Sequence, residues 1–178
     1  MYLIRSRGTI LALCILAWSS AQAEIPSASG DCVAGTIETT PSSDFTVLGG
    51  GQVVRHETTG LEWRRCTEGM SWSGIHCTGT AISRNWYDVL QHAHAESGWR
   101  LPNINELRSI VERCRMNPAI NQQVFPGTPE SFPESFFWSA SPSAPYSRGA
   151  WGVSFYGGSV DTWSTSNGAR VRLVRDAQ

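Results

Sequence analysis

The stretch "GWRLPNINELRSIVERC", residues 98–114, contains the pattern on which the predicted fold depends. Pro102 has no amide hydrogen to donate, and it biases Leu101 toward an extended backbone. Asn103 can then cap the start of a helix. Glu106 follows three residues later, where its carboxylate can accept a bond from the Asn103 amide. The spacing therefore predicts a capping box at the start of a helix.

The predicted helix begins at Ile104 and runs to about Cys114, with its apolar residues on one face. Glu106 lies at the positive end of the helix dipole, so we expect a structural role for it rather than that of a metal ligand, acid or base. Arg100 follows a tryptophan, so we expect it to be partly buried and bonded to carbonyls or a carboxylate. The structural motif comprises Trp99, Arg100, Leu101, Pro102, Asn103 and Glu106.

A second helix is predicted upstream, in "NWYDVLQHAHAES", where Asn85 can serve as N-cap. Its apolar stripe, at spacings of three, four and seven residues, comprises Trp86, Val89, Leu90 and Ala93.

Most of the remaining patterns indicate strands. "QVVRHETTGLEWRRC" predicts a hairpin, because two apolar runs flank a turn signal. "TEGMSWSGIHCTGTAIS" is interpreted as an irregular loop bounded by a disulfide. "FFWSAS", "AWGVSF", "GGSVDTW" and "ARVRLVR" predict further strands, and in the last Val171 and Leu173 alternate with Arg170 and Arg172. The fold class predicted is α+β, with two helices packed on antiparallel strands, disulfide stabilisation and long loops.

The N-terminus has the organisation of a Sec-type signal peptide. Two arginines precede the apolar run "TILALCILAW", and "AQA" supplies small residues at a cleavage site before Glu24. We expect residues 1–23 to be removed, residues 24–50 to form an extended lead-in, and residues 51–178 to form the domain. An uncleaved anchor helix is the alternative, although the run is short for a membrane span. The expected location is the bacterial periplasm, the cell surface or the exterior.

Cleavage would remove Cys14 and leave Cys32, Cys66, Cys77 and Cys114. An even number of cysteines in an exported chain indicates disulfides, here with three possible pairings. We favour Cys66–Cys77, which closes a short loop rich in glycine and serine, together with Cys32–Cys114. A zinc site is disfavoured because no C-x-x-C pair is present.

Composition argues against several functional classes. The processed chain would retain about 12 arginines against 15 acidic residues, a net charge of about −3, and contains no lysine. Nucleic-acid binding is not expected of such a chain, nor is Schiff-base chemistry. His92 and His94 lie two residues apart and would point to different sides of a helix, so no metal site is expected. No nucleophile elbow, phosphate loop or dinucleotide motif is present, and we expect neither a cofactor nor catalytic residues.

Aromatic residues in turns supply the candidate binding site. Exposed aromatic rings beside charged and amide side chains can stack on a sugar and bond to its hydroxyl groups. Packing of these rings beneath loops is the alternative for each of them. The candidate ligand-binding residues are Tyr146, Arg148, Tyr156, Asp161, Trp163, Asn167 and Arg170.

The motifs "TTGLEWRRC", "CTGTAISRNWYDVLQHA", "WRLPNINELRSIVERC", "NPAINQQVFP", "FWSASP", "AWGVSF" and "VRLVRD" occur in that order, from about Thr39 to Asp176. Together they resemble the Lcl C-terminal domain family. "WRLPNINEL" is also more distantly similar to a segment of the formylglycine-generating, sulfatase-modifying family. Both resemblances imply a C-type-lectin-like fold.

The resemblance to the Lcl family implies an adhesin-type binding domain, with a glycan or a cell-surface protein as partner and a trimer as one oligomeric state. Acidic residues that the family usually carries before its first hairpin strand and before Trp99 are replaced by "GGGQVVRH" and Gly98. The resulting prediction is an exported, non-enzymatic binding or adhesion domain without a membrane span after cleavage. The alternatives are a sulfatase-modifying-type enzyme and a structural component of a pilus or secretion apparatus.

Overall fold

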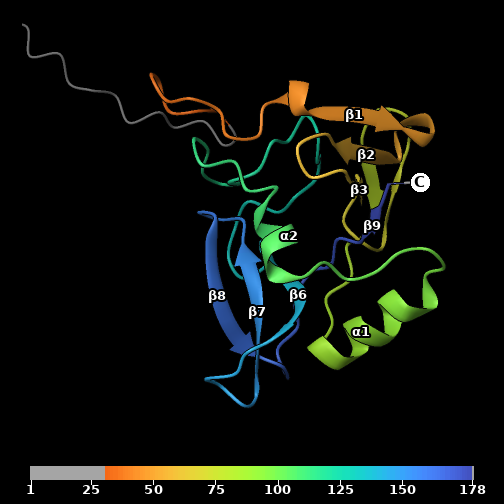
Figure 1. Cartoon of the computed structure of the whole chain (residues 1–178), viewed down its shortest axis with the longest axis vertical. Coiled ribbons are helices and arrows are strands. Elements are labelled where there is room, and N and C mark those ends of the chain that lie inside the picture. Colours follow the sequence, from red (N-terminus) through yellow and green to blue (C-terminus); the bar gives the residue numbers. More distant parts are fainter. Residues whose placement is uncertain (1–30, 178) are drawn as a thin grey trace, which may run out of the picture.

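A computed structural model describes residues 31–177. The predicted signal peptide and the first residues of the predicted lead-in lie outside the described residues. The described chain contains two helices and nine strands in antiparallel sheets, with two short 3-10 helices (Figure 1). The prediction of a mixed helix and strand fold with antiparallel pairing is confirmed.

The larger sheet has four strands in the order β1-β2-β3-β9. The predicted hairpin is confirmed as β2 (Val53–His56) and β3 (Leu61–Arg64), with His56 opposite Leu61. β1 (Phe45–Leu48) lies within the segment expected to be an extended lead-in, between the 3-10 helices η1 (Ser42–Asp44) and η2 (Gly49–Gly51). β9 (Val174–Asp176) pairs with β3, so the C-terminal strand closes the sheet that begins near the N-terminus.

The smaller sheet has the order β6-β7-β8, formed by β6 (Phe136–Pro142), β7 (Gly149–Ser154) and β8 (Ser159–Ser164). Its strands β6 and β7 are largely buried on both faces, whereas β8 is partly exposed. Phe137 packs in a core shared with the larger sheet and α2, whereas Phe136 and Trp138 pack in a second core beneath α1. Alternate residues of one strand therefore serve two cores, as the two-residue period of a strand requires.

Helix α1 (Trp86–Ala95) is confirmed, with the Asn85 side chain accepting a bond from the Asp88 amide. Helix α2 (Ile104–Arg108) starts where predicted but has only five residues, so the predicted extension to about Cys114 is wrong. Beyond the helix the Glu112 amide bonds to the Ala119 carbonyl. Tertiary hydrogen bonds therefore replace those that would have continued the helix.

Two other segments differ from their predictions. The loop expected to be irregular contains a hairpin of β4 (Met70–Trp72) and β5 (Cys77–Gly79). The stretch expected as a terminal strand begins its regular pairing only at Val174, and Arg172, predicted by alternation to face away from the core, is fully buried. Burial lowers the pKa of Arg172 to about 9.

Arg172 is stabilised in the interior by hydrogen bonds rather than by a direct ion pair. Its guanidinium donates to the carbonyls of Arg64 and Arg65 and to the hydroxyl of Thr128. It also lies over the ring of Phe125 at 4.8 Å. This side chain links the end of β3 to the loops beside it.

Both favoured disulfides are present, Cys32–Cys114 and Cys66–Cys77. The first joins the N-terminal segment to the chain beyond α2, and the second links the start of β5, next to the hairpin turn, to the chain just after β3. Within residues 31–177, neither helix has the length and apolar character needed to cross a bilayer.

Candidate functional site

The stretch on which the fold prediction rested forms a structural joint. Asn103 accepts bonds from the amides of Asn105 and Glu106, and the Glu106 carboxylate accepts the Asn103 amide at 2.8 Å, so the capping box is confirmed. Arg100 donates two bonds to Glu106, at 2.7 and 2.9 Å, and a third to Asp176. The arginine thus connects the start of α2 to β9, and both members of the pair are engaged in the scaffold.

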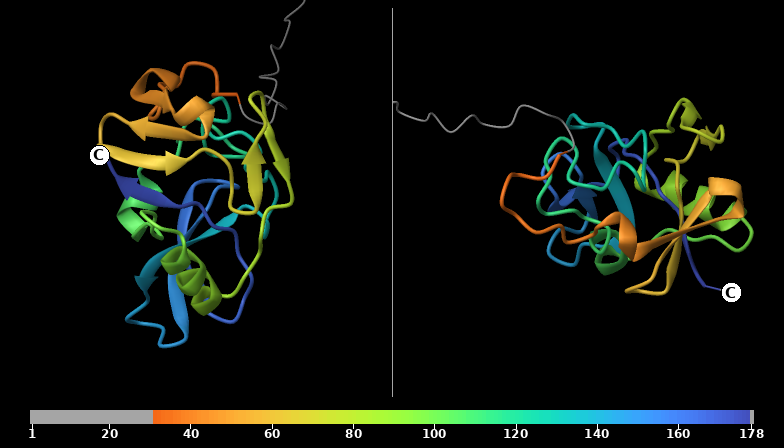
Figure 2. Two further views of the ribbon diagram at one scale, coloured as in Figure 1. Left: turned by 90° about the vertical axis from the view of Figure 1, so that its right-hand side faces the viewer. Right: turned by 90° about the horizontal axis from the view of Figure 1, so that it is seen from above.

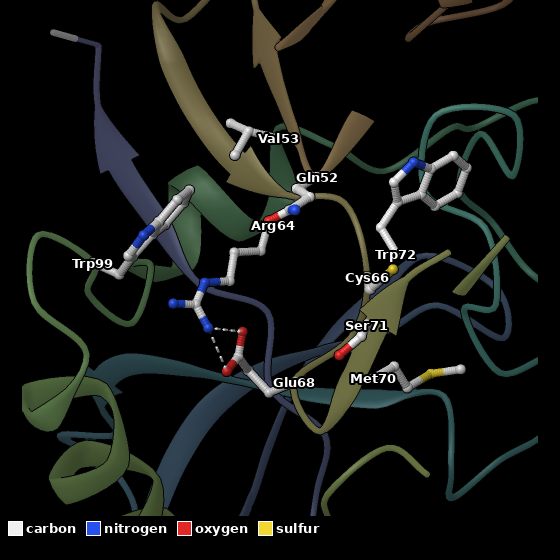
Figure 3. A pocket seen from close by; sticks show the side chains of 9 residues that line it. All are labelled: Gln52, Val53, Arg64, Cys66, Glu68, Met70, Ser71, Trp72 and Trp99. Carbon is white, nitrogen blue, oxygen red and sulfur yellow. Dashed lines mark hydrogen bonds and ion pairs between the residues drawn. The ribbon is translucent and has the colours of Figure 1, made fainter. Parts of the chain in front are cut away.

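A hollow lies elsewhere in the described chain, between the ends of β2 and β3, the β4–β5 hairpin and the loop after α1. Its volume is about 370 Å³. In Figure 3 the indole of Trp99 lies on one side, the indole of Trp72 lies on the other, and Arg64 extends between them toward Glu68. We call this hollow the cleft; its lining residues are Gln52, Val53, Arg64, Cys66, Glu68, Met70, Ser71, Trp72 and Trp99.

Arg64 and Glu68, on the wall of the cleft, belong to an ionic network that continues behind it to Glu96 and His92. Arg64 donates from Nη1 to both oxygens of Glu68, at 3.0 and 3.1 Å, and from Nη2 to Glu96 at 2.6 Å. His92 Nε2 lies 3.0 Å from Glu68 Oε2. Hydrogen bonding and charge attraction from Arg64 lower the pKa of Glu96. The network therefore holds two carboxylates around one guanidinium at the edge of solvent.

The two tryptophans of the cleft are each stacked with arginine. The guanidinium of Arg64 lies 5.1 Å from the centre of the Trp99 ring, and that of Arg175 lies 4.5 Å from it. Arg65 lies 4.1 Å from the Trp72 ring. Cation–π contacts of this kind fix the orientation of an indole without covering its edge.

Gly51 allows the Trp72 indole to approach the backbone. Its φ is +94°, a conformation that L side chains rarely adopt, and a Cβ at this position would collide with the indole nitrogen of Trp72. The "GGG" segment before β2 therefore helps to shape the cleft.

The cluster of Glu68, His92 and Glu96 also has the spacing of a metal site, since one ligand atom from each lies within 4.8 Å of the others. Arg64 already bonds to both carboxylates and supplies the positive charge that a cation would bring. The arrangement is therefore charge-compensated. It offers hydrogen-bond donors and acceptors to a polar ligand rather than an open coordination site.

The residues predicted to bind ligand do not form one site. Tyr146 and Arg148 lie in the turn before β7, and Tyr156 lies in the turn after it, at the opposite end of the hairpin in Figure 1. Asp161, on β8, accepts a bond from Ser159, and Asn167 lies in the turn after β8. The seven residues are therefore distributed along the β7–β8 hairpin and beyond it.

Two members of that set have structural contacts. Trp163 is partly buried and packs with Phe136, at 4.7 Å between ring centroids, and with Trp138. Arg170 donates to the carbonyl of Ala81. Trp163 therefore follows the alternative of packing beneath loops.

Sequence reasoning missed the residues of the cleft. Arg64 and Glu68 are four residues apart on either side of a disulfide cysteine, and His92 and Glu96 are four apart near the end of α1. The second spacing places both side chains on one face of the helical turn and could have indicated a polar surface there. Nothing in the sequence indicated that the two pairs meet.

Comparison with known families gives one match. A sequence model described as the Lcl C-terminal domain matches residues 52–175, which include every residue of the cleft and the Trp99–Glu106 joint. No curated protein sequence matches the chain.

Proposed function

Because this chain belongs to the Lcl C-terminal domain family, we propose that it is an exported, non-enzymatic binding or adhesion domain that recognises a glycan in the cleft. The ligand class follows from the chemistry of the wall, which presents guanidinium, carboxylate and indole groups together. A hydroxyl-rich ligand can donate to Glu68, accept from Arg64 and pack its apolar carbons against an indole edge.

One observation carries this proposal, the hollow of about 370 Å³ in which the Arg64–Glu68 ion pair lies between two tryptophans. Binding pockets for small ligands have volumes in this range and combine aromatic walls with a few convergent polar groups. The polar groups of the cleft are held by one another, so they are ordered before any ligand arrives. Such preorganisation lowers the entropic cost of binding.

The structural features that support an exported binding domain are the disulfides. All four cysteines of the described chain are paired, and disulfides persist in oxidising compartments such as the periplasm and the exterior. The alternative of a sulfatase-modifying-type enzyme requires free active-site cysteines. The pairing leaves residues 31–177 without a thiol for that chemistry.

The C-type-lectin-like fold is part of the same proposal. Its support is the closing of one sheet by strands from both ends of the chain, with two helices between them and long loops carrying the cleft. In such an architecture the scaffold is constant and the loops supply recognition.

The test uses the full chain, expressed with its leader and purified after export. A glycan array would identify ligands, and calorimetry would give their dissociation constants. Arg64→Met keeps much of the stem that packs on Trp99 and removes the donors, so we expect the dissociation constant to rise about tenfold or more. Ser71→Trp fills the hollow from its exposed edge and should abolish binding while leaving the network intact.

Two matched controls accompany these variants. Arg55→Met removes an ion pair from the surface of β2 outside the cleft, and Ser147→Trp places the same bulk in an exposed turn. Both should bind like the wild type. Glycan binding that survives Arg64→Met and Ser71→Trp would overturn the cleft as the site. Recovery of the protein in sheared surface filaments, without glycan binding, would favour the pilus or secretion component.

A further inference from the structure

A second surface of the molecule combines exposed apolar side chains with arginines that lack partners. Nine large apolar side chains are exposed in residues 31–177, and four belong to three chain segments that meet at the Cys32–Cys114 disulfide. Their exposed fractions are 46% for Val33, 87% for Ile37, 56% for Met116 and 45% for Tyr156. We call these four residues, with Arg108 and Arg113, the N-terminal patch.

Backbone contacts establish that the three segments are neighbours. The Val33 amide donates to the Cys114 carbonyl at 2.8 Å, and the Asn117 amide donates to the Tyr156 carbonyl at 2.9 Å. Arg115 pairs with Glu38 at 2.6 Å, beside Ile37. Figure 1 shows the first described residues and the loop after α2 on the left side of the molecule, above the β7–β8 turn.

The two arginines border a hollow of about 370 Å³ beside Thr39 and Thr40. Both are exposed, and within the described chain neither guanidinium has a hydrogen bond or an ion pair. The nearby acids do not neutralise them directly, because Glu38 is bonded to Arg115 and Glu112 is buried beneath main-chain donors. Asp31 is the remaining exposed acid of the segment.

The route of the chain supplies a further argument. In Figure 2 the described chain begins in orange at an outer edge of the molecule. Its first residue, Asp31, precedes Cys32, which is bonded to Cys114 beside the patch. Residues 1–30, which include the apolar run "TILALCILAW", are attached at this point. Before the leader is removed, the patch therefore lies at the end of the domain that is connected to the apolar run.

From these observations we propose that the N-terminal patch docks the domain on a membrane surface rich in anionic phospholipid. Exposed apolar side chains beside unpaired arginines form the pattern of an interfacial membrane contact, and basic residues gain attraction from anionic headgroups. A second copy of the chain fits less well, because a two-fold interface would bring Arg108 and Arg113 of both copies together. The patch shares no residue with the cleft, so this proposal is independent of the proposed function.

Vesicle flotation of the exported, processed chain tests the proposal. We expect it to float with vesicles of phosphatidylglycerol in phosphatidylethanolamine and to remain unbound with phosphatidylcholine vesicles. The double variant Ile37→Ser with Met116→Ser should reduce the partition coefficient about tenfold or more, because two exposed apolar side chains no longer enter the interface. Arg108→Glu with Arg113→Glu should abolish binding, since both attractive charges become repulsive.

The chain offers matched controls for both variants. Ile75 is 83% exposed on the β4–β5 turn, away from the patch, so Ile75→Ser should float like the wild type. Arg84 and Arg148 are exposed and have no side-chain partner in the described residues, so Arg84→Glu with Arg148→Glu makes the same change of charge elsewhere. Near-ultraviolet circular dichroism checks that each variant is folded.

Several results would overturn the proposal. These are equal binding to both kinds of vesicle, no binding to either, or equal losses in the patch and control variants. A dimer in sedimentation equilibrium that Ile37→Ser dissociates would assign the patch to a second copy. Retention on heparin, lost in the Arg108→Glu, Arg113→Glu double variant, without vesicle binding would assign it to a polyanionic glycan.

Discussion

The N-terminal patch and the cleft are built from the same parts in different ways. At each of them lie a disulfide and a buried glutamate two residues from one of its cysteines: Cys32–Cys114 with Glu112 beside the patch, and Cys66–Cys77 with Glu68 at the cleft. Glu112 accepts amide bonds from Thr39, Thr40 and Cys114 and hydroxyl bonds from the two threonines. Glu68 is held by the side chains of Arg64 and His92.

Glu112 is held by main-chain amides, whereas Glu68 is held by side chains alone. We call the first a structural carboxylate and the second an adaptable one. Main-chain donors cannot leave Glu112 unless the backbone moves, so that glutamate ties the N-terminal segment to the chain beyond α2. The partners of Glu68 are side chains at the edge of solvent, so a change in them does not require the backbone to move. Buried carboxylates of similar exposure can therefore have opposite roles, and the identity of the donors distinguishes them.

Removal of the disulfides should lower the free energy of unfolding more than any other change. It is the first test of the comparison between the N-terminal patch and the cleft. Replacing Cys32 and Cys114 by serine should lower the free energy of unfolding by about 4 to 5 kcal/mol, because this bond closes the longer loop. The same change at Cys66 and Cys77 should cost about 3 kcal/mol. Denaturant unfolding of both double variants measures the two values, and a larger loss at Cys66–Cys77 would contradict the assignment of the N-terminal bond as the main structural tie.

Substitution of the two glutamates should give the next largest difference. Glu112→Gln places an amide donor against donors that need an acceptor, so we expect a loss of about 3 kcal/mol in the free energy of unfolding. Glu68→Gln retains an acceptor for Arg64 in a place where side chains can move, and about 1 kcal/mol should be lost. Equal losses for the two variants, measured by denaturant unfolding, would show that Glu112 and Glu68 do not differ in their structural role.

Acid should affect the Glu112 tie in a predictable direction. Burial raises the pKa of Glu112, but the hydrogen bonds of Thr39, Thr40 and Cys114 outweigh it, and the net pKa is lowered from 4.5. A carboxyl whose pKa is lower in the folded state stabilises the fold above its unfolded pKa, and this contribution is lost as the pH falls toward the folded value.

We therefore expect the free energy of unfolding to decrease as the pH drops below about 4.5, by up to about 1.4 kcal/mol per pH unit from this group. In Glu112→Gln the decrease should be shallower, because the titrating group is gone. Unfolding curves across this acid range measure both slopes. Parallel slopes in wild type and variant would show that Glu112 does not contribute.

His92→Gln should have the smallest effect on stability. His92 is partly exposed, and Glu68 keeps its bonds to Arg64 when the imidazole is removed. A loss of about 0.5 kcal/mol in the free energy of unfolding is expected. Glycan binding should nevertheless weaken measurably if the network orients the ligand, and calorimetry gives that value. A loss in the free energy of unfolding as large as that of Glu112→Gln would show that His92 is needed for the stability of the fold.

Sequence reasoning was most successful where the determinants are local. The Asn103–Glu106 capping box, the Asn85 cap and the hairpin around "ETTG" each depend on residues a few positions apart, and each was confirmed. The favoured disulfide pairing was confirmed as well.

The errors arose where distant segments compete for the same backbone. α2 ends at Arg108 because the amide of Glu112 bonds across the chain to Ala119 and its carboxylate bonds to Thr39 and Thr40. The alternation around Arg172 gave no indication that its side chain enters the core, since the carbonyls and hydroxyls that receive it come from β3 and two loops.

The sequence by itself therefore determined the fold class, the helix starts and the family, and it favoured the disulfide pairing that the structure contains. Caps, turns and two-residue alternation act through neighbours along the chain, so they can be identified before the chain folds. Only the tertiary structure decided where α2 ends, which carboxylate is structural, and that Arg64 and Glu68 meet His92, Glu96 and Trp99. These depend on which distant groups satisfy a buried charge or amide, and that is settled only when the segments come together.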